Sequence, residues 1–294
     1  MTDAAPSPTV GPSRSDDPPA DAVVVGLGPD GPLGLPAEAP SEALGRLVES
    51  GEARSAVGAV AHTHAPDGVR WILVGLGADP TDEDRRAAVG AAVRHARTLR
   101  ASTVRVVLDD AAGAAAAAEA ATLALHEPAK VVGRPAADPD PDAGTGGEAP
   151  AVRIAGPGGA VADDDATAAV DRASAVAGAQ NAARVLQQLP SNHLTPRLLA
   201  TRARALADEL PGLEATVEVG IGALRRRGMG LFAAVSHGSD QPPALITLRW
   251  EPEGASGPLL ALVGKAVTHD TGGYSLKPPL SMRTMRFDMS GGAA

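Results

Sequence analysis

The chain of 294 residues contains no cysteine. This absence excludes disulfide bonds, thiolate nucleophiles and metal sites built on thiolates. Any bound metal ion must therefore be held by carboxylates, by histidines or by an unusual neutral lysine. Aromatic residues make up only 2% of the sequence, whereas hydrophobic residues make up 44%. The composition is therefore sufficient for a hydrophobic core, which alanine, valine and leucine must fill.

The sequence also lacks an apolar run of about 18 residues, which is the length that a membrane span needs. Basic residues are in the minority, and the formal net charge is -9. This balance argues against nucleic acid or a membrane surface as a partner, because both attract basic faces. Residues 1–21 are rich in Pro, Ser and Asp and lack the pattern of a signal peptide. We expect a disordered tail there, and we expect a cytoplasmic protein.

Apolar runs alternate with helical patterns after residue 21. We predict buried strands at residues 22–27, 70–77 and 103–108, and helices at residues 41–50, 81–99 and 111–125. Thr81 is a candidate N-cap, with Asp84 three residues later. Such alternation predicts an α/β unit around a largely parallel sheet. We place this N-terminal domain at residues 22–165, with a loop at 136–150 and one more strand at 152–155.

An alanine-rich stretch at residues 166–188 predicts a helix that links this domain to a second region at residues 189–294. There, Thr195 and Pro196 predict the start of a helix that runs to about Leu210. Further strands are expected at residues 217–219, 244–249 and 259–267, with a short helix at 222–227. The fold class predicted is therefore α/β in both regions.

His62 and His64 form a His-x-His pair on a polar stretch. Such a pair can bind a metal ion when it lies on a strand, but a pair of solvated loop histidines is the more frequent arrangement. We favour the solvated pair. Gly-Leu-Gly sequences follow two of the predicted strands, at residues 26–28 and 75–77. They lack the longer glycine pattern of nucleotide-binding sites, so we interpret them as tight turns at the ends of the strands.

Four charged residues stand out near the end of the chain, in the sequences VGKAVTHDTGGYSLKP at residues 263–278 and MRTMRFDMSGGAA at 282–294. They are Lys265, Asp270, Lys277 and Asp288. One interpretation is a set of surface ion pairs. The other is a metal-assisted hydrolase, with aspartates that bind divalent ions and lysines that serve as a neutral ligand and as an oxyanion stabiliser.

These two segments resemble the signature of the leucine aminopeptidase (cytosol aminopeptidase) family, VGKGVTFDSGGxSxKP followed by MKxDMGGAA. The spacing from Lys265 to the other three charged residues is the same. Residues 189–196, 228–235 and 238–243 are similar to the family as well, and the likeness spans about residues 22–294. The resemblance implies a small N-terminal α/β domain followed by the first part of a metallo-aminopeptidase catalytic domain.

The resemblance also implies a role for each site residue. Lys265, Asp270 and Asp288 would be ligands of two divalent metal ions, manganese or zinc, with Asp270 between the two ions. Lys277 would be the catalytic lysine, and Met285 would line the pocket for the first side chain of the substrate. The substrate amine would lie on the metal ion held by Lys265 and Asp288. The implied activity is release of N-terminal residues, preferably leucine, from peptides by a full-length homo-hexamer.

The departures from the signature include Ala266 for glycine, His269 for phenylalanine, Arg286 for lysine and the extra Ser290. The family also has a later motif, NTDAEGR, which supplies further metal ligands and an arginine and does not occur among these residues. We therefore expect a truncated chain that is inactive and poorly soluble by itself. The alternatives are a non-catalytic binding or regulatory remnant of the family, and an incomplete gene product.

Overall fold

The structure is a computed structural model that describes residues 9–127 and 149–294. The chain divides into two compact units, with the boundary in the long helix between Asn181 and Ala182. We call them the N-terminal unit and the C-terminal unit. No helix in the described ranges is long and apolar enough to cross a membrane. The loop expected at residues 136–150 falls almost wholly outside the described residues.

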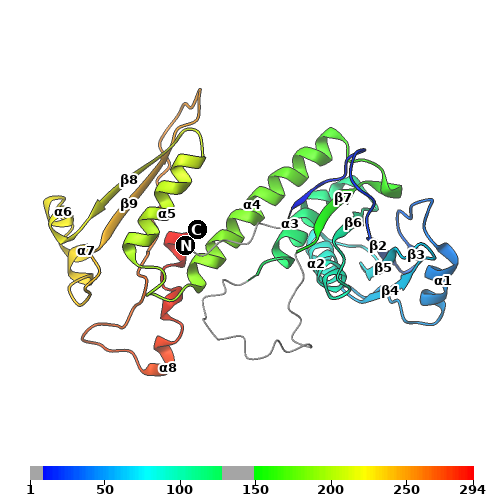
Figure 1. The fold of residues 1–294 in the computed structure, drawn as a ribbon, viewed down its shortest axis with the longest axis horizontal. Coiled ribbons are helices and arrows are strands. Elements are labelled where there is room, and N and C mark those ends of the chain that lie inside the picture. The colour runs from blue at the N-terminus through cyan, green and yellow to red at the C-terminus, as the bar shows by residue number, and fades with distance from the viewer. Residues whose placement is uncertain (1–8, 128–148) are drawn as a thin grey trace. The chain divides into compact units, whose positions relative to one another are not determined.

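The N-terminal unit is built on one mostly parallel sheet with the strand order β1-β7-β6-β2-β5-β4, and β3 pairs with β2 (Figure 1). The pairs β1–β7, β7–β6, β6–β2 and β2–β5 are parallel. β4 is antiparallel to β5, and β3 is antiparallel to β2. Its strands are β1 (Val10–Pro12), β2 (Ala22–Gly28), β3 (Gly31–Pro32), β4 (Val60–His64), β5 (Arg70–Gly75), β6 (Thr103–Val107) and β7 (Ala151–Ala155). The predicted α/β sheet is confirmed.

Helices cover both faces of this sheet, which explains why the central strands are apolar throughout. The helices are α1 (Ser41–Glu49), α2 (Asp82–Thr98), α3 (Ala114–Ala124) and α4 (Asp164–Gln188), with short 3-10 turns η1 (Ala111–Gly113) and η2 (Pro157–Gly159). Val24 of β2 faces α2, α3 and the first turns of α4, whereas Val25 faces Leu44 of α1.

The start of α2 is fixed by the residues that the sequence indicates. The Thr81 hydroxyl accepts a hydrogen bond from the Asp84 amide at 3.2 Å, and the Asp84 carboxylate accepts one from the Thr81 amide at 3.0 Å. These reciprocal bonds satisfy two amides that the helix leaves without partners. The predicted capping box is confirmed.

The segment from Thr9 to Asp21 differs from the disordered tail that we expected over residues 1–21. Val10–Pro12 forms β1, which pairs in parallel with β7, and Arg153 Nε lies 3.0 Å from Asp17 Oδ1. The partner strand is about 140 residues away along the chain, so local composition could not indicate it. Residues 1–8 lie outside the described residues.

His62 and His64 lie on β4 rather than on a solvated loop, so that expectation is wrong. β4 pairs antiparallel with β5, with His62 opposite Ile72. It is an edge strand that carries three polar residues, and a search for apolar runs overlooks such a strand.

The C-terminal unit packs one helix against a two-stranded antiparallel sheet. Its elements are α5 (Pro196–Glu209), β8 (Leu213–Val219), α6 (Ile221–Arg226), α7 (Gly230–Val235), β9 (Ala244–Trp250), α8 (Pro279–Met282), η3 (Met285–Phe287) and α9 (Ser290–Ala293). The Thr195 hydroxyl accepts from the Leu198 amide at 3.3 Å, so the predicted cap of α5 is confirmed. The core of this unit joins Leu189, Leu194, Leu199 and Met289.

The strand predicted at residues 259–267 is absent from the described structure. Leu262 is 88% exposed and Val263 is 97% exposed. A strand needs a neighbouring strand for its backbone hydrogen bonds, and no described segment pairs with this one. An apolar run was therefore not sufficient to predict a strand.

Candidate metal centre

The four charged residues indicated by the sequence lie together in the C-terminal unit. Lys265 Nζ is 2.6 Å from Asp288 Oδ2 and 3.4 Å from Asp270 Oδ2. Lys277 Nζ is 2.9 Å from Asp270 Oδ2. Met285 joins the cluster, since its Sδ atom lies 2.9 Å from Lys277 Nζ. The structure thus brings all five candidate residues into one continuous group.

Asp270 is held by the turn that follows it. The Gly272 amide donates a hydrogen bond to Asp270 Oδ1 at 2.8 Å, and the Lys277 amide donates to the Thr271 carbonyl at 2.9 Å. Gly272 has φ of 90° and Gly273 has φ of 65°. Both lie in the left-handed region that glycine adopts without strain. The two glycines of the motif therefore form the turn that returns Lys277 to Asp270.

Asp288 is positioned by the glycine-rich helix α9, which lies directly against the backbone at Lys265. The Gly292 amide donates to the Lys265 carbonyl at 2.8 Å. A Cβ atom on Gly292 would lie 2.6 Å from the Cβ atom of Ala266, and one on Gly264 would lie 2.0 Å from the carbonyl oxygen of Gly291. Small residues are therefore required on both sides of this contact, and Ala266 fits because its partner is glycine.

The adjoining Met289 anchors this segment in the core of the unit. Its side chain is fully buried, in a cluster with Leu194 and Leu199. The hydroxyl of Ser290, a residue that the family signature lacks, donates to Gln187 Oε1 at 2.7 Å. Asp288 therefore directly precedes a buried anchor and a hydrogen-bonded helix start, which together fix its backbone.

The charges in the cluster hold each other in the ionised state. The Lys277 ammonium, and next the Gly272 amide, keep the pKa of Asp270 well below its usual range. The hydrogen bond to Asp288, with help from Asp270, raises the pKa of Lys265. The carboxylates of Asp270 and Asp288 are 28% and 29% exposed, so solvent and small ligands reach them.

The donor set fits a divalent cation. Two carboxylates converge on one point, where the Lys265 ammonium now supplies the positive charge. A metal ion at this point would be held by both carboxylates, and by the Lys265 amine once it has lost its proton. Across the described ranges, no group of three or more His, Cys, Asp and Glu side chains is arranged to hold an ion.

Two of the substituted residues, His269 and Arg286, are next to Asp270 and Met285 in the sequence. His269 is exposed. The guanidinium of Arg286 lies over the Phe287 ring, 4.9 Å from its centroid. This distance is typical of a cation–π contact.

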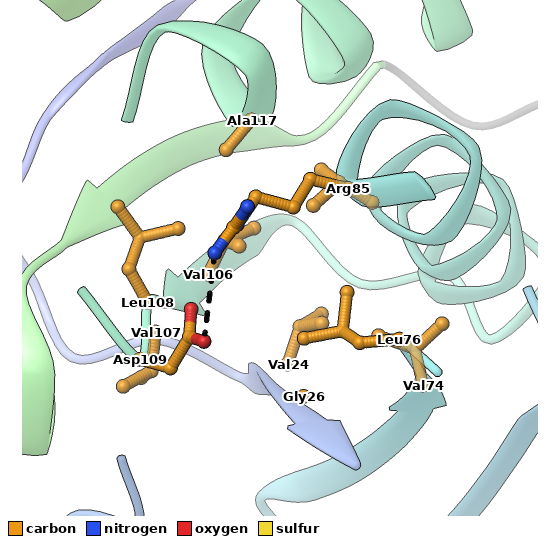
Figure 2. Close-up of a pocket in the computed structure, with 11 residues that line it drawn as sticks. Val24, Gly26, Val74, Leu76, Arg85, Val106, Val107, Leu108, Asp109 and Ala117 are labelled. Carbon is orange, nitrogen blue, oxygen red and sulfur yellow. Dashed lines mark ion pairs between the residues drawn. The ribbon is translucent and has the colours of Figure 1, made fainter. Parts of the chain in front are cut away.

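A small cavity lies elsewhere, in the N-terminal unit between α2 and the sheet (Figure 2). Arg85 extends into it from α2, 3.8 Å from the Asp109 carboxylate and 3.0 Å from that of Asp110. Its volume of about 20 Å³ has room for roughly one water molecule. It is too small for a peptide.

Comparison with known proteins identifies both parts of the chain. Residues 22–130 match the model of the cytosol aminopeptidase family, N-terminal domain, and residues 181–294 match the model of the catalytic domain. A probable cytosol aminopeptidase of Koribacter versatilis is 35% identical over 271 residues, which cover 86% of this chain and 52% of the relative. One from Micrococcus luteus is 34% identical and covers 97% of this chain and 57% of the relative.

Solved structures show the same fold. A mutant of tomato leucine aminopeptidase matches with a TM-score of 0.75 at 20% identity, over 99% of this chain and 58% of the other. The bottromycin maturation enzyme BotP in complex with Mn matches with a TM-score of 0.71 at 30% identity, over 94% and 54%. This chain spans about half the length of the curated relatives that it matches. Both domain models of one family match in order along the sequence, and the chain belongs to the cytosol aminopeptidase family.

Proposed function

We propose that the whole protein is a metal-dependent aminopeptidase that releases N-terminal residues, preferably leucine, from peptides. The observation that carries this proposal is the convergence of Asp270 and Asp288 on Lys265, with Lys277 on the other side of Asp270. Membership of the cytosol aminopeptidase family supports it. The rival interpretation, a non-catalytic remnant, has no observation in its favour.

In this proposal, Lys265, Asp270 and Asp288 would hold two divalent ions, manganese or zinc, and Asp270 would serve as a ligand of both. Manganese is supported by the complex of the related BotP with Mn. When bound, such ions polarise a carbonyl group and lower the pKa of water at the site. Each ion needs further ligands, which the rest of the protein would contribute.

Lys277 is suited to act on the carbonyl oxygen of the scissile bond. Its ammonium is 2.9 Å from Asp270, so it lies beside the proposed metal position rather than in it. A fixed positive charge at this place stabilises the negative charge that develops on the oxygen during peptide hydrolysis. Met285, in contact with the same ammonium, would border the pocket for the first side chain of the substrate. Asp288 would contribute to binding the substrate amine.

The proposal includes the remaining organisation of the protein. We place an N-terminal α/β domain at residues 22–165, to whose sheet the preceding β1 adds a strand, a linking helix at 166–188 and the first part of the catalytic domain at 189–294. A cytoplasmic homo-hexamer is proposed from the family resemblance.

The test is hydrolysis of Leu-p-nitroanilide with Mn²⁺ by the protein expressed from the complete gene. Lys277→Met should lower kcat by at least about 100-fold, which is the loss expected when one oxyanion-stabilising donor is removed. Arg226→Met removes an exposed cation from α6 and is the matched control. If Lys277→Met retained the activity of the parent protein, the assignment of Lys277 would be wrong.

A further inference from the structure

A histidine pair lies in the N-terminal unit, in residues that the proposed aminopeptidase chemistry does not use. His62 on β4 and His95 on α2 are separated by 33 residues, yet His95 Nε2 lies 3.1 Å from His62 Nδ1. Their ring centroids are 4.9 Å apart. Two imidazole nitrogens from different elements therefore converge on one place.

We infer that His62 and His95 form a second metal site, which binds a divalent transition ion through His62 Nδ1 and His95 Nε2. Imidazole nitrogens bind Zn²⁺, Ni²⁺ and Cu²⁺. With bonds of about 2.05 Å to both nitrogens, their 3.1 Å separation gives an N–metal–N angle of about 98°. Two neighbouring ligands of a tetragonal ion subtend nearly this angle, so the pair suits Cu²⁺ and Ni²⁺.

The surroundings keep both rings in the state that a metal ion requires. A histidine binds metal only through a neutral ring. Burial lowers the pKa of His95, with a smaller contribution from His62. Burial also lowers the pKa of His62, followed by the charges of His64 and Arg70. Both rings are only partly buried, so water molecules have access to complete the coordination.

The present arrangement needs little change to accept an ion. One ring nitrogen now donates a hydrogen bond to the other, and the ion would replace that proton. Rotation of a histidine ring about its Cβ–Cγ bond has a broad, shallow energy profile, so both lone pairs can be directed at one point. Arg70 lies on the neighbouring strand, and its positive charge disfavours binding of a cation. We therefore expect micromolar rather than nanomolar affinity for Cu²⁺, which corresponds to about 8 kcal/mol.

His64 provides a matched control on the same strand. It lies two residues from His62, with their ring centroids 5.5 Å apart, and its side chain is exposed. His95→Gln retains much of the size and polarity of the side chain but removes the imidazole, and His62→Asn does the same on β4. The exposed His237 in the C-terminal unit is a second control.

The experiment is Cu²⁺ titration of the whole chain followed by electron paramagnetic resonance, with the thermal midpoint of unfolding measured in parallel. We expect nitrogen hyperfine structure from two imidazoles, and a rise in the midpoint because the ion binds the folded state. His62→Asn and His95→Gln should each weaken this binding by more than about tenfold, since even an outer-shell change costs that much. His64→Ala and His237→Ala should retain it.

Unchanged spectra in both His62→Asn and His95→Gln would overturn the site. So would a loss in His64→Ala as large as that in His62→Asn, because the pair would then not be the ligand set. Circular dichroism of each variant without metal must match that of the parent chain. If the His95→Gln variant does not fold, His62→Asn decides the question by itself. The Lys265 cluster is intact in every variant, so its own Cu²⁺ signal is a constant background.

Discussion

Lys265 Nζ lies 2.6 Å from Asp288 Oδ2, although 23 residues separate the two along the sequence. A backbone hydrogen bond brings the two segments together, since the Gly292 amide donates to the Lys265 carbonyl. Met289 holds the same segment in the core. The geometry of the charged cluster therefore depends on how closely α9 approaches the chain at Lys265, and a substitution in α9 tests this dependence.

Gly292→Ala should destabilise the C-terminal unit by about 1–3 kcal/mol, which is the usual cost of overpacking. The added Cβ atom would lie 2.6 Å from Ala266 Cβ and 3.1 Å from the Lys265 carbonyl oxygen. Urea unfolding of the chain measures the effect. Gly178→Ala is the control, because nothing lies within 4 Å of its Cβ position in α4, and it should be neutral or stabilising. Equal effects of the two substitutions would contradict the packing described here.

Gly75→Ala should be more damaging, with a loss of more than about 3 kcal/mol in the N-terminal unit. Its Cβ atom would lie 2.1 Å from the Ala56 carbonyl oxygen and 2.6 Å from that of Arg54. These are backbone atoms, which cannot move aside as a flexible side chain can. The measurement is the thermal midpoint by circular dichroism. Gly45→Ala, in open space on α1, should leave the midpoint unchanged or raise it.

Lys277→Met should raise the pKa of Asp270 toward its usual range. The hydrogen bond from Lys277 is the largest cause of the lowered pKa, whereas that from Lys265 is the smallest of the favourable ones. Lys265→Met should therefore raise the pKa less. Carbon-13 NMR titration of the labelled carboxylate gives both values without added metal. A larger shift in Lys265→Met than in Lys277→Met would reverse the assigned order.

The stability of the N-terminal unit should fall as the pH is lowered through 6.5, the ordinary pKa of histidine. Burial lowers the pKa of both His62 and His95 in the folded chain. Between the folded and unfolded pKa values the unfolded chain binds more protons, so stability rises with pH in that window. Unfolding midpoints at pH 8, 6.5 and 5 measure the slope. His95→Gln should flatten it, and an unchanged slope in this variant would assign the effect to other groups.

The 294-residue chain by itself should not release leucine from Leu-p-nitroanilide with Mn²⁺. Within the described ranges only Asp270 and Asp288 supply carboxylates to the centre, with Lys265 as the third donor. Two ions cannot be held in a defined geometry by so few ligands. The matched experiment compares this chain with the product of the complete gene at equal concentration. Turnover by the 294 residues at a similar rate would show that three ligands suffice.

The sequence alone predicted the elements whose signals are local. The apolar run at residues 22–27 became β2, and the capping box at Thr81 became the start of α2, because burial on both faces and a cap are encoded within a few residues. The strand at residues 10–12 was missed because its partner lies about 140 residues away. The pairing of Lys265 with Asp288 was expected only through family resemblance, since spacing alone also suited surface ion pairs.

His95 was missed for a similar reason. A lone histidine within a helical pattern has no local signal that relates it to His62. The distance between the two rings is set by the packing of α2 over β4 and β5, which no short sequence window contains. Met289, in contrast, was part of the recognised motif, yet only the structure shows that it is the buried anchor of the site.

The apolar stretch at residues 259–263 has no partner strand among the described residues, and this exposure bears on how long the protein lasts in a cell. Leu259, Leu260, Leu262 and Val263 are each at least 80% exposed. Short apolar segments without charge and without a partner strand are the sequences that nucleate aggregates. Holdase chaperones bind such segments, and proteases cleave them readily. For as long as these four side chains stay uncovered they offer a binding site to chaperones, and the lifetime of the protein depends on how quickly they become covered.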